Sequence, residues 1–332
     1  MTIRSFDRNS GTPSFPRLQL EPKFNLLMIV NPKLLMSENF IEIGNFVRGR
    51  APDIRVILIS DSVKSRPLLK KAEDRPTLAF SPMVLHSVRP KRGKVYSGQP
   101  LPKLDQMRML KRFGIPVPRW TTIEPDTHLS PEEWGPLVVV KPSAFGAATS
   151  SRGINAQLTE EMRYRFPQSY PKGHPGRLGP MIAQQFIDTG ARPAQIRVLT
   201  LFGTPLYAEE IRARNEQVFP DPVTKETLER FNITPVTEER DRAFVYDKDV
   251  LDLARRVYSA VPEVPLQAVD IIREAQTGKL YVLEINPGGN TWHFSSKYGR
   301  HQLIEGRKRE DQFDAFQLAA DVLIERTRRE AC

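Results

Sequence analysis

Three continuous apolar runs of strand length stand near the start of the chain. They are FNLLMIV (24–30), DIRVILIS (53–60) and TLAFS (77–81). Runs of this kind are typical of strands that are covered on both faces. Between the first two, SENFIEIGNFV has the spacing of a helix that Ser37 caps and that ends near Gly49. This β-α-β order predicts an α/β unit over 23–98, preceded by a loose arm over 1–22.

The rest of the chain mixes strand hairpins with helices. A connector rich in proline, glycine and basic residues covers 89–102, and the helix after it ends at Gly114. The predicted elements are helices over 104–115, 250–261 and 314–329, strands over 136–142 and 181–187, and hairpins over 195–212 (turning at Gly203) and 267–286. This mixture predicts an α+β part after the α/β unit.

Composition and charge indicate a globular protein with anionic partners. Of 332 residues, 39% are hydrophobic and 27% charged, and no apolar run approaches the roughly 18–20 residues of a membrane span. The N-terminus has no apolar signal segment and the single cysteine is Cys332, so we expect a cytoplasmic setting. The net charge of +10 favours phosphates, carboxylates, nucleic acid or acidic lipid. Basic segments at 86–94 and 305–310 are interpreted as solvated faces.

An acid and an amide interrupt the end of an apolar strand. Glu284 and Asn286, in LEIN, stand two residues apart and therefore project from one face. If the hairpin closes around EAQTGK, Asp270 lies near Glu284, and two like charges destabilise such a ladder. A cation between them would remove the repulsion, and three oxygen ligands favour Mg²⁺ or Mn²⁺ over zinc. The alternative is that Asp270 and Glu284 are separate charges on a solvated face.

A lysine ends another strand that is predicted to be buried. Lys141 follows PLVVV and precedes a loop of small residues over 143–153. Small residues let backbone N–H groups approach phosphate oxygens, and a lysine adds a point charge. The alternative is a lone lysine that extends from a strand end into solvent. The sequence contains no GxxxxGK[ST], HExxH, GxSxG or CxxC motif.

From about residue 100 to the end, an ordered set of motifs resembles the ATP-grasp superfamily. Its members are mostly ATP-dependent carboxylate–amine ligases, such as the ribosomal-protein glutamate ligases, glutathione synthetase and D-alanine–D-alanine ligase. The matching positions are Lys103 with a helix and GIPVP ending at Pro118, Lys141 in VVVKP, AQQFI (183–187), Asp188, Arg197 and Arg212 in IRV…EEIR, and Asp270, Glu284 and Asn286. Each motif alone is weak, whereas the ordered set is specific.

The resemblance implies a fold and its division into domains. Residues 23–98 would form an N-terminal Rossmann-like α/β domain, and 99–332 a two-lobed ATP-grasp domain. The central lobe would cover 99–190 and the C-terminal lobe 191–332. ATP would bind between the lobes, with 143–153 as a lid over its phosphates.

The resemblance also implies how the nucleotide and metal would be held. Lys103 and Lys141 would bind the α- and β-phosphates, with Ser143 and Gly146 in the lid. The hinge of Gln184, Gln185, Phe186 and Ile187 would bind adenine, through the main chain of Gln184 and Phe186, and Asp188 would bind the ribose. Asp270, Glu284 and Asn286 would hold Mg²⁺ or Mn²⁺.

Further residues would act on the substrate. Arg197 and Arg212 would stabilise an acylphosphate and the tetrahedral intermediate that follows it. The substrate-binding positions implied are Arg214, Gly288, Gly289, Asn290 and His293. A lone histidine beside Trp292 is nevertheless more often structural than catalytic.

The sequence departs from the superfamily pattern at several positions. Gln185 stands where glutamate is usual, and Gln195 where an acid often precedes the first arginine by two. The lid has few glycines and carries Arg152, a candidate extra phosphate contact. After Arg214, the S-N-x-x-x-G-G stretch of the glutamate-adding branch is absent, which argues against that branch.

The implied reaction joins a carboxylate to an amine through an acylphosphate and releases ADP and phosphate. The partners would be small-molecule or peptide substrates, and a homodimer is an open expectation because dimers are common in the superfamily. Two alternatives remain: an ATP-grasp kinase of a small anionic substrate, and a basic polyanion-binding protein without ligase activity. Neither a membrane nor a nucleic acid is the expected partner, since no recognition module is visible and aromatic residues are not interleaved with the basic runs.

Overall fold

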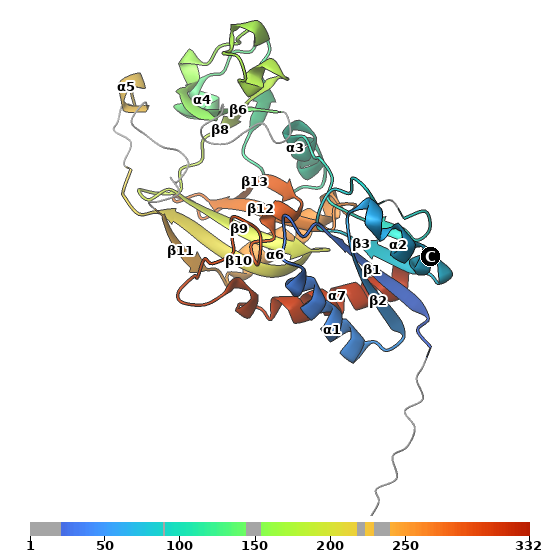
Figure 1. Cartoon of the computed structure of the whole chain (residues 1–332). Coiled ribbons are helices and arrows are strands. Elements are labelled where there is room, and N and C mark those ends of the chain that lie inside the picture. Colours follow the sequence, from blue (N-terminus) through green and yellow to red (C-terminus); the bar gives the residue numbers. More distant parts are fainter. Residues whose placement is uncertain (1–20, 89, 144–153, 218–222, 229–239) are drawn as a thin grey trace, which may run out of the picture.

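The computed structural model of the chain describes residues 21–88, 90–143, 154–217, 223–228 and 240–332. The first 20 residues of the expected arm lie outside these ranges, and so does the expected lid after Ser143, including Gly146 and Arg152. The described strands form three sheets (Figure 1). None of the described helices is long and apolar enough to cross a membrane.

A parallel four-stranded sheet begins the fold. Its strands follow the order β2-β1-β3-β4. The elements are β1 (Phe24–Val30), α1 (Ser37–Arg50), β2 (Ile54–Ser60), α2 (Arg66–Lys71), β3 (Thr77–Phe80) and β4 (Lys94–Tyr96). The central strand β1 is almost wholly buried, as its continuous apolar run predicts.

Three details of this sheet differ from the sequence predictions. Strand β2 is only half-buried, because it lies at the edge of the sheet. Helix α1 follows Met36 and has no side-chain cap, so the prediction that Ser37 caps it is wrong. Strand β4 lies inside the predicted connector, and its three residues are too few to show a hydrophobic period.

An antiparallel four-stranded sheet forms a separate small lobe at the top of Figure 1. Helix α3 (Lys103–Arg112) leads into it from the N-terminal sheet. Its elements are β5 (Trp120–Thr122), α4 (Pro131–Trp134), β6 (Leu137–Pro142), β7 (Asn155–Leu158) and β8 (Met181–Gln185), in the strand order β5-β8-β6-β7. Between β7 and β8 the chain has only short 3₁₀ turns, the last two being η4 (Pro167–Ser169) and η5 (Pro175–Arg177).

The third sheet has five described strands in the order β11-β10-β9-β12-β13. Its elements are β9 (Ala194–Leu201), β10 (Thr204–Ala213), α5 (Lys225–Leu228), β11 (Arg240–Phe244), α6 (Lys248–Ala260), β12 (Leu266–Arg273), β13 (Leu280–Pro287) and α7 (Ala315–Glu330). The β9–β10 hairpin turns at Gly203, which has a φ of 82°, as the sequence predicts. Helices α3 and α6 share one apolar core with this sheet.

Helix α7 links the N-terminal sheet to the five-stranded sheet (Figure 1). It contacts α1, β1, β3 and β10. A single apolar core includes Leu26 and Phe80 of the first sheet, Tyr207 of the third and Phe316 of the helix. Trp292, which follows β13, is fully buried in this core and stacks on Phe40 with ring centroids 5.1 Å apart. These contacts fix the N-terminal sheet beside the end of β13.

A substitution of Gly299 tests how tightly the segment after β13 is packed. A Cβ added there would lie 2.2 Å from the carbonyl oxygen of His293, which is a backbone atom. We predict that Gly299→Ala lowers the free energy of unfolding by about 1–3 kcal/mol, because relieving the clash requires a backbone shift. Urea denaturation followed by circular dichroism measures the change, and an unaltered midpoint would contradict the prediction.

Gly49→Ala is the matched control. Gly49 lies in α1, and a Cβ added there meets nothing within 4 Å. Alanine should therefore raise the free energy of unfolding by about 0.5–1 kcal/mol, since glycine is the more flexible residue in the unfolded chain.

Candidate active site

Two carboxylates, one buried and one partly buried, face each other across the last hairpin. The register pairs Asp270 on β12 with Glu284 on β13, as the sequence predicts, and pairs Ala268 with Asn286. Asp270 is 3% exposed. Because residues two apart share a face of a strand, Asn286 projects on the same side as Glu284. The alternative of separate solvated charges is therefore wrong.

Three further side chains contact these acids. Arg197 on β9 donates from Nε and Nη2 to the two oxygens of Asp270, both at 2.8 Å. The amide nitrogen of Asn286 donates to Asp270 at 3.0 Å. Lys103, at the start of α3, donates to Glu284. Each carboxylate thus has its own cation, which a buried ion requires.

The surroundings shift the pKa values of the two acids in opposite directions. Burial alone would raise the pKa of Glu284, but the charges of Lys103 and Lys141 lower it to about 2. Burial raises the pKa of Asp270, and the neighbouring charge of Glu284 adds to this, against the opposing effect of Arg197. Glu284 is therefore the more strongly acidic of the pair.

Lys141 approaches the same place from the small lobe. It lies on β6, is 5% exposed, and donates from Nζ to the side-chain oxygen of Gln184 at 2.8 Å. Burial, and then the positive charge of Lys103, lower the pKa of Lys141 from 10.5 to about 7. Lys141 is thus a buried ammonium that loses its proton easily and whose hydrogen-bond partner is neutral. Binding of an anion beside it would stabilise its charged form.

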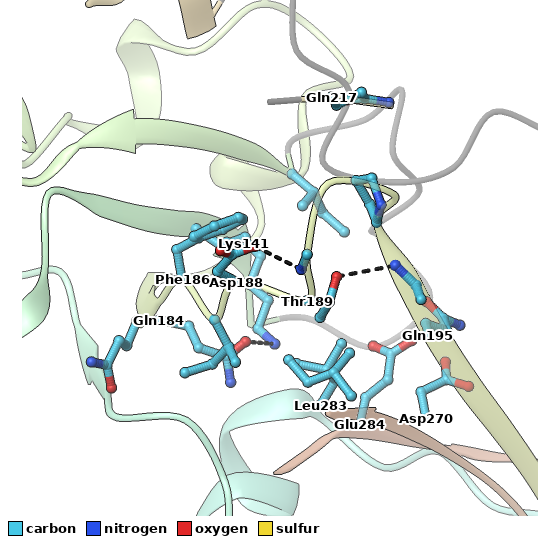
Figure 2. Close-up of a pocket in the computed structure, with 18 of the residues that line it drawn as sticks. Lys141, Gln184, Phe186, Asp188, Thr189, Gln195, Gln217, Asp270, Leu283 and Glu284 are labelled. Atoms are coloured by element: carbon cyan, nitrogen blue, oxygen red, sulfur yellow. Dashed lines mark hydrogen bonds between the residues drawn. The ribbon is translucent and has the colours of Figure 1, made fainter. Parts of the chain in front are cut away.

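A pocket lies between the small sheet and the five-stranded sheet, and Figure 2 shows its lining. Nine of the predicted nucleotide and metal residues line it: Lys103, Lys141, Gln184, Gln185, Phe186, Ile187, Asp188, Asp270 and Glu284. Ser143 does not line it. Its carbonyl oxygen accepts from the Lys103 N–H at 3.0 Å, so it anchors the start of α3.

The sequence analysis missed the apolar walls of this pocket. Val139 and Ile272 line it, together with Leu283. The first two stand two residues from Lys141 and Asp270, so strand alternation was a usable signal for both. Leu283 lies at an irregularity of the β12–β13 ladder, which strand periodicity does not reveal.

The hinge has a different arrangement from the expected one. Register pairs Gln184 with both Trp120 and Val139, so its main chain lies inside the sheet and only its side chain is directed at Lys141. The Phe186 N–H donates to the Leu137 carbonyl at 3.3 Å. Main-chain recognition by these two residues was expected, whereas the sheet already uses the main chain of Gln184 and the N–H of Phe186. Within the described part of the chain, Ile187 makes no backbone hydrogen bond.

The two predicted arginines do not share a face. Arg197 pairs in register with Glu209 and Asp270, whereas Arg212 pairs with Ala194, three residues from Arg197. Odd separations along a strand reverse the face, so Arg212 projects away from the carboxylates. It forms an ion pair with Glu210 at 2.7 Å.

The predicted substrate residues divide between two environments. Gly288, Gly289 and Asn290 line a second pocket of about 330 Å³. Arg214 is exposed and pairs with Asp241 instead. His293 is buried, stacks on Tyr207 and lies 3.6 Å from Glu209, outside both pockets.

Gly289 has a structural reason to lack a side chain. A Cβ there would lie 1.9 Å from the sulfur of Met83. The resemblance implies substrate binding at this glycine, whereas its close neighbour is the loop after β3. Gly288 has a φ of 126°, a conformation that favours glycine.

The N-terminal sheet supplies the other wall of the second pocket. Asn31 and Leu34 follow β1, and Met83, Val84 and His86 follow β3. These strands are parallel, so their carboxyl ends lie at one edge, where open α/β sheets place ligands. The sequence analysis assigned these residues no role, although this edge rule could have indicated them.

Lys103 and Glu284 line both pockets. The first pocket lies between the two antiparallel sheets, and the second lies between β13 and the N-terminal sheet. A ligand in one pocket would therefore meet a ligand in the other at this lysine and glutamate. The arrangement can bring two reactants together beside a cation-compensated carboxylate pair.

The chain matches no protein-family model and no curated protein. Among solved structures it is similar to the ATP-grasp ligase PsnB complexed with a minimal precursor, at 16% identity and a TM-score of 0.50 over 92% of this chain and 100% of that one. It is also similar to D-alanine–D-alanine ligase from Bacillus anthracis, at 16% identity and a TM-score of 0.48, covering 92% and 98%. The macrocyclase MdnC of Microcystis aeruginosa MRC, bound with precursor peptide MdnA, gives 11% identity and a TM-score of 0.48, covering 91% and 99%.

The chain therefore has the ATP-grasp fold. This is the fold that its ordered motifs predict. Its mixed α/β architecture, with several sheets, agrees with the expected fold class.

The pKa of Lys141 predicts how stability changes with pH. Between pH 7 and 10.5 the unfolded chain keeps the proton that the folded protein has lost, so stability should rise with pH in this window. The rise should be at most about 1.4 kcal/mol per pH unit. Urea unfolding at pH 7, 8 and 9, compared with Lys141→Met, isolates the contribution. If the difference between the two proteins were constant with pH, the assignment would be wrong.

Proposed function

We propose that this protein is an ATP-dependent ligase that joins a carboxylate to an amine and releases ADP and phosphate. The observation that carries the proposal is the meeting of two pockets at Lys103 and Glu284. One pocket has the lysines and hinge suited to a nucleotide, and the other has a wall from the N-terminal sheet suited to a substrate. Phosphoryl transfer depends mostly on such alignment and on charge neutralisation.

Lys103 and Lys141 are proposed to bind the phosphates of ATP. Both extend into the pocket between the sheets, and Lys141 has no carboxylate of its own among its hydrogen bonds in the described structure. The apolar walls, Val139, Ile272 and Leu283, suit the adenine ring, and the Ile187 N–H is a donor for a ring nitrogen. Asp188, at the mouth of the pocket, keeps its proposed contact with the ribose.

The residues fit a hard divalent cation. Asp270 is buried and Glu284 is partly buried, so their charges need partners, and Lys103 and Arg197 now provide them. Together with Asn286 they would offer oxygen ligands to Mg²⁺, which usually keeps waters and shares phosphate oxygens. Mn²⁺ takes the same ligands. When bound, the ion would neutralise charge on the β- and γ-phosphates.

The proposed reaction has two steps. A substrate carboxylate oxygen attacks the γ-phosphorus, the bond to the bridging β–γ oxygen breaks, and ADP leaves. The amine nitrogen then attacks the acyl carbon, phosphate leaves with the electron pair, and the amine loses a proton. Lys103 would hold both the nucleotide and the acyl donor in line.

Arg197 is proposed to hold Asp270 in place and to stabilise the developing charge. Its Nε and Nη2 are occupied by Asp270, while Nη1 makes no hydrogen bond in the described part of the structure. An oriented donor of this kind is worth roughly 3–4 kcal/mol. Arg212 has no such part in the proposal, because it projects from the opposite face.

Glu284→Gln tests the proposed site. We expect it to lower ATP turnover roughly 10²–10³-fold or more, because one negative oxygen that balances the cations is lost. The exposed Glu263→Gln serves as the control and should turn over ATP at the unsubstituted rate. Circular dichroism checks that both variants are folded. A folded Glu284→Gln with full turnover would exclude the metal assignment.

The ligase itself is tested by ADP release with a panel of carboxylates and amines, followed by mass spectrometry of the products. We expect ADP release to require a carboxylate and the amide product to require an amine. A stable phosphorylated product without any amine dependence would favour the kinase alternative. Salt-sensitive polyanion binding with no ATP turnover would favour the binding protein.

A further inference from the structure

A third pocket lies on the reverse face of the small sheet. Along β6, Val139 and Lys141 line the pocket between the sheets, while Val140 between them projects to the other side. There it forms the floor of a pocket of about 360 Å³ together with Ile123 and Met181. The segment that covers this side, 159–180, lies away from β12 and β13 (Figure 1).

The rim of this pocket consists of hydrogen-bond donors on two extended segments. Arg163 and Arg165 both line it, from the segment before η4. Asn155 and Gln157 do the same from β7. Arg163 donates to the carbonyls of Glu160 and Met162, whereas Arg165 makes no hydrogen bond or ion pair within the described residues.

A stacked ring pair completes the rim. Tyr170 and His174 stack with centroids 4.6 Å apart and planes at 6°. The Gly176 N–H donates to Nδ1 of His174 at 3.0 Å, so the neutral ring carries its proton on Nε2. A Cβ on Gly176 would lie 2.8 Å from the Tyr170 ring, so this tight turn requires glycine. The local backbone therefore fixes the position of the two stacked rings.

The charge around this pocket is uncompensated. No aspartate or glutamate lines it, and none occurs between residues 162 and 187. That interval contains four cations, namely Arg163, Arg165, Lys172 and Arg177, none of which has an ion pair in the described structure. Elsewhere in the described structure most arginines form an ion pair, as Arg197 does with Asp270. An anion would supply the missing charge.

We propose that this pocket binds a small anionic ligand. Its carboxylate or phosphate group is held by Arg163 and Arg165, and its apolar part lies on the floor formed by Ile123, Val140 and Met181. Planar guanidinium groups bind both anions in a bidentate manner. The site shares Ile154 with the nucleotide pocket, but its arginines lie outside the nucleotide and substrate pockets, and it does not depend on the proposed ligase activity.

A nucleic acid fits this surface less well, although aromatic and basic residues alternate in RYRF (163–166), contrary to the sequence expectation. Tyr164 and Phe166 pack edge to face on each other, with centroids 5.2 Å apart. Tyr170 and His174 stack on each other, so each ring has one face that is already occupied and not open to a base. Sequence-independent strand binding needs free ring faces in a row, whereas this pocket is a single hollow.

The test uses two probes with an apolar ring, phenyl phosphate and benzoate, and the neutral benzamide as their matched control. Calorimetric titration of the full chain measures binding. We expect both anions to bind at least about tenfold more tightly than benzamide, because only they can pair with the arginines. The tighter of the two identifies phosphate or carboxylate as the preferred group. Equal binding of benzamide would overturn the proposal.

Substitutions locate the binding. Arg165→Gln should weaken both anions at least about tenfold and leave folding unchanged, since Arg165 has no partner to lose. The double variant Arg163→Gln/Arg165→Gln should weaken them further. Lys172→Gln, on the same segment but outside the pocket lining, should bind like the unsubstituted protein. Unchanged affinity in Arg165→Gln, or loss of binding in Lys141→Met, would refute the site.

Discussion

The structure depends on one electrostatic constraint, the placement of two carboxylates opposite each other in a buried ladder. Asp270 and Glu284 repel across the β12–β13 pair, where Asp270 is buried and Glu284 is partly buried. They are tolerated because Arg197 comes from the adjacent strand β9 and Lys103 from helix α3. Removing either cation would leave a buried charge without a partner, a change that typically costs about 3–5 kcal/mol. The site therefore has to be assembled from four separate elements, β12, β13, β9 and α3.

The position of Lys103 follows from the way α3 covers the edge of a sheet. Strand β13 is the last strand of its sheet, so its outer N–H groups need partners. The side chain of Gln106, buried in α3, accepts from the Ile285 N–H at 2.8 Å, and the Pro116 carbonyl accepts from the Val282 N–H at 2.8 Å. The same hydrogen bonds that protect the edge hold the first turn of α3 beside Glu284.

The N-terminal sheet contributes to the site through packing as well as through its loops. Its core is continuous with the five-stranded sheet through α7 and Trp292, which has Phe40 against its ring and a hydrogen bond from Nε1 to Asn39 at 3.1 Å. The turn after β13 is thereby pressed against Met83, and Gly289 is the residue that permits this contact. The loops after β1 and β3 thereby form a wall of the second pocket.

The sequence by itself determined those features that depend on local periodicity and spacing. Apolar runs predicted β1, β6 and the paired hairpins, and the two-residue spacing of Glu284 and Asn286 predicted a shared face opposite Asp270. Only the tertiary structure decided which charges meet. Whether Arg212 shares the face of Arg197 depends on the register of β10 against β9, and which cation balances Glu284 depends on how α3 packs. The reverse pocket beneath Arg163 and Arg165 was likewise invisible, because its floor and rim come from strands and turns far apart in the chain. Spacing along the chain fixes the face of a strand, but contacts between elements arise from packing, which no short stretch of sequence encodes.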